Sequence, residues 1–88
     1  MKVILRFIGS LALKAGGNRI EFELPASTTL GKAASLVFKT YKLGSIEASE
    51  NGATSGYVQI FLNRKVMPTN QILKEGDEIS FLPPITGG

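Results

Sequence analysis

This chain of 88 residues contains no cysteine and no histidine. Without cysteine there is no disulfide, no thiolate metal site and no cysteine nucleophile. Without histidine, the commonest general base, the usual Ser-His and Cys-His nucleophile pairs are excluded as well. A chain that lacks both residue types is poorly equipped to catalyse a reaction by itself. We therefore do not expect this chain to be an enzyme by itself.

Long apolar runs and clustered charge are also scarce. No apolar run approaches the length of a membrane span, and the apolar start of the chain is interrupted by Arg6 and followed by Gly9, so we expect no signal peptide. The net charge is +3, but the basic residues are scattered, and only Arg64 and Lys65 are adjacent. Nucleic-acid binding needs a clustered basic stripe, so solvated surface charge is the better interpretation. The sequence predicts a cytoplasmic protein with no membrane or nucleic-acid partner.

Apolar residues are frequent enough to build one small domain, at 43% of the chain. Alternation of the strand type predicts four β-strands, at 3–8, 19–24, 57–62 and 77–82. The first two strands read as an antiparallel hairpin with a broad connection. Between the third and the last strand we expect a turn at 63–65, a short return strand at Val66–Met67 and one helical turn within Thr69–Leu73.

Helical spacing of apolar residues predicts one main helix from about residue 30 to residue 42. Thr29 supplies a hydroxyl for the N-cap, and Gly44 is the expected C-cap. Residues 45–56 are polar and glycine-rich without periodicity, which predicts a surface loop.

This order of elements predicts an α+β fold, a β-grasp roll in which one helix covers one face of a mixed sheet. The first and last strands would lie parallel in its middle. The predicted core consists of Val3, Leu5, Phe7, Ile20, Phe22, Leu24, Val58, Ile60, Leu62, Ile79 and Phe81. The domain would span residues 1–82.

The other face of the predicted sheet has no helix to cover it. Apolar residues gather there among polar ones: Ile4, Ile8, Phe61 and Leu82, with Arg6, Gln59, Ser80 and Glu78 around them. A contiguous exposed apolar patch is typical of a binding surface. The alternative is ordinary scattered exposure of apolar side chains.

The last six residues, 83–88, form a tail directly after the last predicted strand. They read Pro83, Pro84, Ile85, Thr86, Gly87 and Gly88. Two prolines end sheet pairing and favour a stiff, extended path, and two glycines fit into narrow spaces. At about 3.1–3.5 Å per residue, such a tail reaches about 20 Å. The terminal carboxylate could therefore enter a partner's active site, although a frayed terminus is the simpler alternative.

The stretch from Gly76 to Gly88 closely resembles the C-terminus of the small, sulfur-carrying subunit of molybdopterin synthase, the MoaD type. The shared pattern is Gly-Asp-Glu, apolar residues, Pro-Pro, two variable residues and Gly-Gly. Weaker similarity lies in residues 7–11, 29–31 and 62–63. Leu11–Lys14 departs from the family, because it lacks the Arg-Glu often seen after the first strand.

The resemblance implies a ubiquitin-like sulfur carrier. In such families an adenylyltransferase similar to ubiquitin-activating enzymes uses ATP to adenylate the terminal carboxylate, and sulfur then displaces AMP to leave a thiocarboxylate. By resemblance, Gly88 is the reactive terminus, Gly87 fits a narrow channel, and the large subunit of molybdopterin synthase receives the sulfur. No bound cofactor and no metal are expected. A protein modifier joined through Gly88 to lysines, a thiamin-type sulfur carrier and an interaction module with an inert tail remain alternatives.

Overall fold

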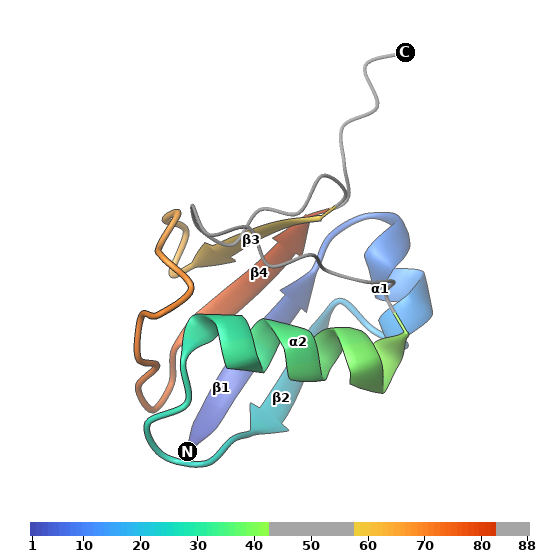
Figure 1. Cartoon of the computed structure of the whole chain (residues 1–88). Helices are drawn as coiled ribbons and strands as arrows, with labels where there is room; N and C mark the ends of the chain where they lie inside the picture. The colour runs from blue at the N-terminus through green and yellow to red at the C-terminus, as the bar shows by residue number, and fades with distance from the viewer. Residues whose placement is uncertain (43–57, 83–88) are drawn as a thin grey trace.

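The computed structural model describes residues 1–42 and 58–82. Within them the elements follow the order β1 (Lys2–Phe7), α1 (Ser10–Ala15), β2 (Arg19–Glu23), α2 (Leu30–Tyr41), β3 (Gln59–Leu62) and β4 (Glu78–Leu82). The strands form one sheet in the order β2-β1-β4-β3, and α2 crosses one face of it (Figure 1). The predicted mixed sheet with one main helix on one face is confirmed. The predictions for 45–56 and for the tail 83–88 lie outside the described residues.

The centre of the sheet is the parallel pair β1 and β4, as predicted. Leu5 lies opposite Ile79 in this pair. β2 pairs with the outer edge of β1, and β3 with the outer edge of β4, both antiparallel. Parallel strands need a crossover between them, and α2 lies on that crossover across the face of the sheet.

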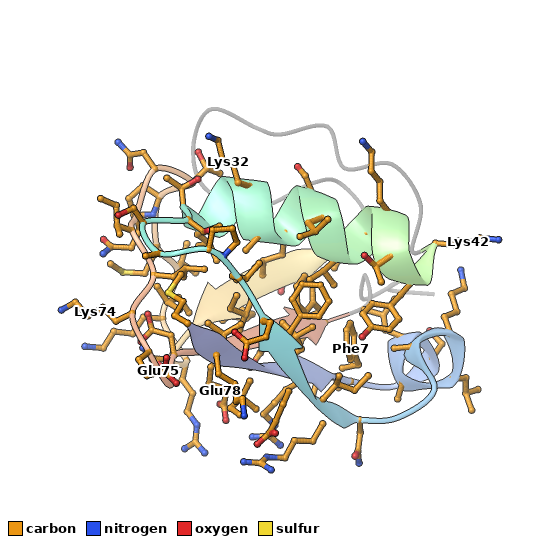
Figure 2. All side chains as sticks on the ribbon, turned by 90° about the horizontal axis from the view of Figure 1, so that it is seen from below. Phe7, Lys32, Lys42, Lys74, Glu75 and Glu78 are labelled. Atoms are coloured by element: carbon orange, nitrogen blue, oxygen red, sulfur yellow. The ribbon has the colours of Figure 1, made fainter. Side chains whose placement is uncertain are left out.

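The core lies between α2 and the sheet face on which the alternation of apolar residues in the sequence predicted it. Phe7 is 1% exposed, and its ring stacks on Phe81 at a centroid distance of 5.2 Å and meets the edge of Tyr41 at 5.5 Å. Figure 2 shows Phe7 between the sheet and α2. Ile20 and Phe22, on the edge strand β2, are only partly buried but pack against this core. The other nine predicted core residues are buried: Val3, Leu5, Phe7, Leu24, Val58, Ile60, Leu62, Ile79 and Phe81.

The start of α2 confirms the predicted N-cap. Thr29 accepts a hydrogen bond on its side-chain oxygen from the backbone N–H of Lys32, at 3.3 Å. The C-cap is Lys42 in a left-handed conformation (φ 55°), with its N–H bonded to the carbonyl of Phe38. The prediction of Gly44 as the C-cap was therefore wrong, because the helix ends at Tyr41, before that glycine is reached.

The connection between β1 and β2 contains a helix that the sequence patterns did not indicate. The six-residue α1 buries Leu11 and ends at Gly16, whose positive φ of 84° lets its N–H reach the carbonyl of Ala12. A helix this short gives fewer than two turns of periodicity, so the pattern was too brief to separate from a loop.

The segment between β3 and β4 also differs from its prediction. Val66–Met67 forms no strand, and pairing there is limited to an isolated bridge between Leu62 and Lys65. Thr69–Leu73 is not helical; after a turn the chain runs extended, and Ile72 forms a bridge with Thr29. This segment bonds to the start of α2 instead of to itself: the carbonyls of Thr69 and Gln71 accept the first N–H groups of the helix, and the N–H of Leu73 donates to the carbonyl of Thr28.

Candidate functional site

The open face of the sheet carries a shallow hollow of about 300 Å³. Its lining residues come from three neighbouring strands and their ends: Arg6, Ile8, Phe61, Arg64, Ser80 and Leu82. Strand register explains the grouping. Ser80 on the central strand β4 pairs with Arg6 on β1 and with Phe61 on β3, so the three side chains lie in one row across the sheet. We call this group the open-face hollow. The predicted gathering of Arg6, Ile8, Phe61 and Leu82 on one face is confirmed.

Ser80 gives the hollow its depth. It is the small residue in the middle of the row Arg6–Ser80–Phe61, and its two larger neighbours leave it only 9% exposed. Ile8 stands at one end of the hollow with 39% of its surface exposed. Such exposed apolar surface beside a concave floor is typical of a protein-binding site.

Ile4 shares this face but does not line the hollow. It lies opposite Glu78, further toward the start of both strands, and is half-buried. The predicted patch is therefore divided, with Ile4 beside the Arg6–Glu78 pair and the remaining apolar residues around Ser80.

Arg64 belongs to the hollow, although the sequence patterns did not single it out. It follows Asn63 in a tight turn, and both residues have positive φ values, 50° and 68°. The Asn63 side chain fixes this turn: its oxygen accepts from the N–H of Glu78, and its amide donates to a carboxylate oxygen of Asp77, each at 3.0 Å. The sequence did indicate a turn at 63–65, but not the face on which its side chains emerge.

Positive charge borders the hollow on two sides. Arg6 makes a partly exposed ion pair with Glu78 at 3.8 Å, a geometry that contributes little to stability. Arg64 has no ion pair among the residues described here. The apolar side chains of Ile8, Phe61 and Leu82 between two guanidinium groups suit a partner surface with an apolar side chain and nearby carboxylates.

Metal-ligand groups and membrane-spanning helices are absent from the described residues. Residues 1–42 and 58–82 hold no group of side chains that could bind a metal ion. Their helices include none long and apolar enough to cross a membrane. The hollow itself holds no acid–base pair, and Ser80 has no histidine to activate it, since the chain has none.

The predicted tail residues begin where β4 ends, at the edge of the hollow. Leu82 is the last residue of β4 and is half-buried. Pro83, Pro84, Ile85, Thr86, Gly87 and Gly88 lie outside the described residues, so their predicted roles stay predictions.

In the described part of the chain, the mixed sheet and the helix α2 across one of its faces define a ubiquitin-like β-grasp protein. The ThiS family model matches residues 5–88, and the chain belongs to this family. The match includes both glycines at the end.

Among curated proteins, the molybdopterin synthase sulfur carrier subunit of Haemophilus influenzae is 46% identical over 33 residues, which are 38% of this chain. The match spans only 41% of that relative's length.

Solved structures of the same fold come from several organisms. SAMP1 from Haloferax volcanii has a TM-score of 0.76 at 19% identity, with both chains covered in full. A protein named as subunit 1 of molybdopterin converting factor, from Pyrococcus furiosus, has a TM-score of 0.78 at 22% identity, covering 97% of this chain and 99% of that one. A chain in a complex of subunits 1 and 2 of the corresponding factor from Helicobacter pylori has a TM-score of 0.59 at 24% identity. The match covers 100% of this chain and 100% of that one. At these identities the likeness shows the fold.

Proposed function

We propose that this protein is a ubiquitin-like sulfur carrier that delivers sulfur from Gly88 for the biosynthesis of molybdopterin, the organic part of the molybdenum and tungsten cofactors. The observation that carries the proposal is the ThiS family match, which continues through the Gly-Gly end to residue 88. The name of the matching Haemophilus influenzae relative, a sulfur carrier subunit of molybdopterin synthase, supports molybdopterin as the product of the acceptor pathway.

The chemistry at Gly88 requires activation from outside. A carboxylate is a poor electrophile, and this chain has neither cysteine nor histidine to change that. In the proposed reaction a partner adenylyltransferase joins the carboxylate to the α-phosphate of ATP and releases pyrophosphate. Hydrosulfide from the sulfur donor then attacks the acyl carbon, and AMP leaves with the electron pair of the C–O bond. The product is a thiocarboxylate on Gly88. ATP is the partner's substrate, and the carrier needs no resident cofactor.

The open-face hollow is the proposed docking site for these partners. It lies where β4 ends, so a partner that covers Phe61 and Leu82 is in place to receive the segment that follows. Ile4 and Ile8 would extend the apolar contact, and the positive charge of Arg6 would favour carboxylates on the partner. An extended tail of six residues reaches about 20 Å from that point. Pro83 and Pro84 would lower the entropy cost of inserting it.

The large subunit of molybdopterin synthase is the proposed second partner. The Helicobacter pylori structure is a complex of subunits 1 and 2 of molybdopterin-converting factor, and the chain of it that matches this protein has the fold described here. Both partners would use the same end of the carrier, so we propose that they bind it in succession.

The test is the intact mass of the protein after incubation with its host's activating enzyme, ATP and a sulfur donor. We expect a gain equal to replacing one oxygen by sulfur, and loss of that gain when Gly88 is deleted. The deletion variant should show an unchanged melting curve, which separates lost chemistry from lost fold. A truncated chain that is still adenylated and sulfurated would contradict the assignment of Gly88.

A protein modifier is the second candidate, because SAMP1, a protein with the same fold, belongs to the small archaeal modifier proteins. In that function the activated Gly88 carbonyl would be attacked by a lysine amine, giving an isopeptide bond instead of a thiocarboxylate. Lysine-linked conjugates recovered from the native host would support it. A thiamin-type sulfur carrier would show the same mass gain but would transfer its sulfur to a thiazole precursor, which separates it from the molybdopterin pathway.

A further inference from the structure

A second groove lies on the opposite side of the molecule from the open-face hollow, between α2 and the segment 69–70. Its volume is about 560 Å³, within the usual range for binding sites. One wall is the outer surface of α2, with Lys32, Leu36 and Lys39, and the other wall is Thr69 and Asn70. Figure 2 shows Lys32 on the side of α2 that faces away from the sheet, whereas Glu78 lies beyond the opposite face.

Gly31 allows the two walls of this groove to meet. A Cβ at this position would lie 3.0 Å from Cβ of Thr69 and 3.2 Å from its carbonyl oxygen. The glycine therefore lets the segment 69–70 approach the helix directly. Its N–H donates to the same carbonyl at 2.8 Å, which fixes that approach.

The start of α2 does not act as an anion site. The N–H groups of Leu30 and Gly31 are bonded to the carbonyls of Gln71 and Thr69, and that of Lys32 to the hydroxyl of Thr29. A ligand in the groove must therefore be held by side chains.

The side chains on the α2 wall place an apolar group between two positive charges. Leu36 follows Lys32 by four residues and precedes Lys39 by three, so all three share one face of the helix. Leu36 is 42% exposed, and both lysines are exposed without an ion pair in the described part of the chain. At about 1.5 Å per residue, the two lysines stand about 10 Å apart along the axis.

The helix dipole favours Lys39, in the last turn of α2, but it does not account for Lys32. The described acidic residues are Glu21, Glu23, Glu75, Asp77 and Glu78, and α2 carries none of them. Lys32 lies in the first turn, where the helix dipole disfavours a positive charge, and no acidic residue stands nearby on the helix to offset it. The groove thus offers one apolar side chain, Leu36, between two lysines that pair with no carboxylate in the described part of the chain.

We propose that this groove binds an acidic segment of another protein, with one bulky apolar side chain on Leu36 and carboxylates at Lys32 and Lys39. Charge complementarity selects this occupant over a basic or neutral one. Because the groove and the open-face hollow lie on opposite layers of the molecule, the segment would bind without displacing a partner from the sheet. This surface is independent of the chemistry proposed for Gly88.

The probe is a library of random twelve-residue peptides selected on the full-length protein, followed by affinity measurement for each enriched peptide. We expect peptides with an apolar residue between acidic ones, and a loss of at least tenfold in affinity for Lys32→Glu/Lys39→Glu and for Leu36→Ser. Lys14→Glu/Lys65→Glu changes the net charge equally at exposed positions outside the groove and should keep the wild-type affinity. Melting curves of all variants verify that α2 is intact.

Charge reversal makes the test specific. Peptides whose acidic residues are replaced by lysine should bind the Lys32→Glu/Lys39→Glu variant better than the wild type. Three results would overturn the proposal: no enrichment of acidic–apolar–acidic peptides, equal loss of affinity in the control variant, or equal binding after the peptide's apolar residue is changed to serine. The last result would reduce the groove to a non-specific basic surface.

Discussion

Truncation of Phe7 to alanine should remove a large part of the stability of this domain. The ring is 1% exposed and contacts both Phe81 and Tyr41. A buried Phe→Ala change typically costs about 3–5 kcal/mol, from lost transfer free energy and the cavity left behind. The free energy of unfolding of the whole domain is expected to be about 4–13 kcal/mol, at roughly 0.05–0.15 kcal/mol per residue. Phe7→Ala should therefore lower the melting temperature by at least about 12 °C.

Two further variants separate the sources of this loss. Phe7→Leu keeps most of the apolar volume and removes the two ring contacts, so it should cost about 1–3 kcal/mol. Phe61→Ala, in the open-face hollow, is the matched control and should cost less than about 1.5 kcal/mol, because Phe61 is only partly buried. Urea unfolding followed by circular dichroism measures the stability of all three variants. The slope of the unfolding free energy against urea concentration should be the same for all of them.

The order of these effects decides the assignment of the two faces. Equal midpoints for Phe7→Ala and Phe61→Ala would mean that the core does not lie between α2 and the β1–β4 face. A Phe7→Leu variant as unstable as Phe7→Ala would show that ring packing dominates over buried apolar area.

Two other substitutions test the site and the α2 contact. Phe61→Asp should weaken binding to the large synthase subunit by about thirtyfold, as for an interface hot spot of about 2 kcal/mol. The melting curve of this variant should still show a folded domain. Loss of the fold would show that Phe61 is a core residue. Gly31→Ala should destabilise by about 1 kcal/mol in thermal unfolding, because the contact with Thr69 outweighs the gain of about 1 kcal/mol in helix propensity. A Gly31→Ala variant more stable than the wild type would show that the segment 69–70 can move away from α2 to make room for the added methyl group.

The sequence predicted most of the sheet because alternation has physical meaning there. Val3, Leu5 and Phe7 point toward α2 since successive residues of a strand alternate between faces. The same rule put Arg6 and Phe61 on the open face, and the parallel centre followed from the single crossover helix. Thr29 could be predicted as the N-cap because its hydroxyl acts within one turn of its own backbone.

What the sequence could not supply depends on contacts between distant segments. Thr69–Leu73 has the composition of a helical turn, but its carbonyls are taken by the first N–H groups of α2, about forty residues earlier in the chain. Arg64 reaches the hollow because Asn63 bonds to Asp77 and Glu78 across two strands. No local pattern contains either of these relations.

The two proposed surfaces follow from one property of the fold. A sheet covered by one helix leaves two outer faces, the uncovered side of the sheet and the outer side of the helix. On each face the sequence keeps apolar side chains that add little to folding, Ile8 and Phe61 on the sheet and Leu36 on α2. Each is accompanied by positive charge that no described carboxylate fully compensates, from Arg64 on one side and Lys32 on the other. Under the function proposed above, the carrier passes from an activating enzyme to an acceptor, and a protein held at α2 could accompany it while the partner on the sheet is exchanged.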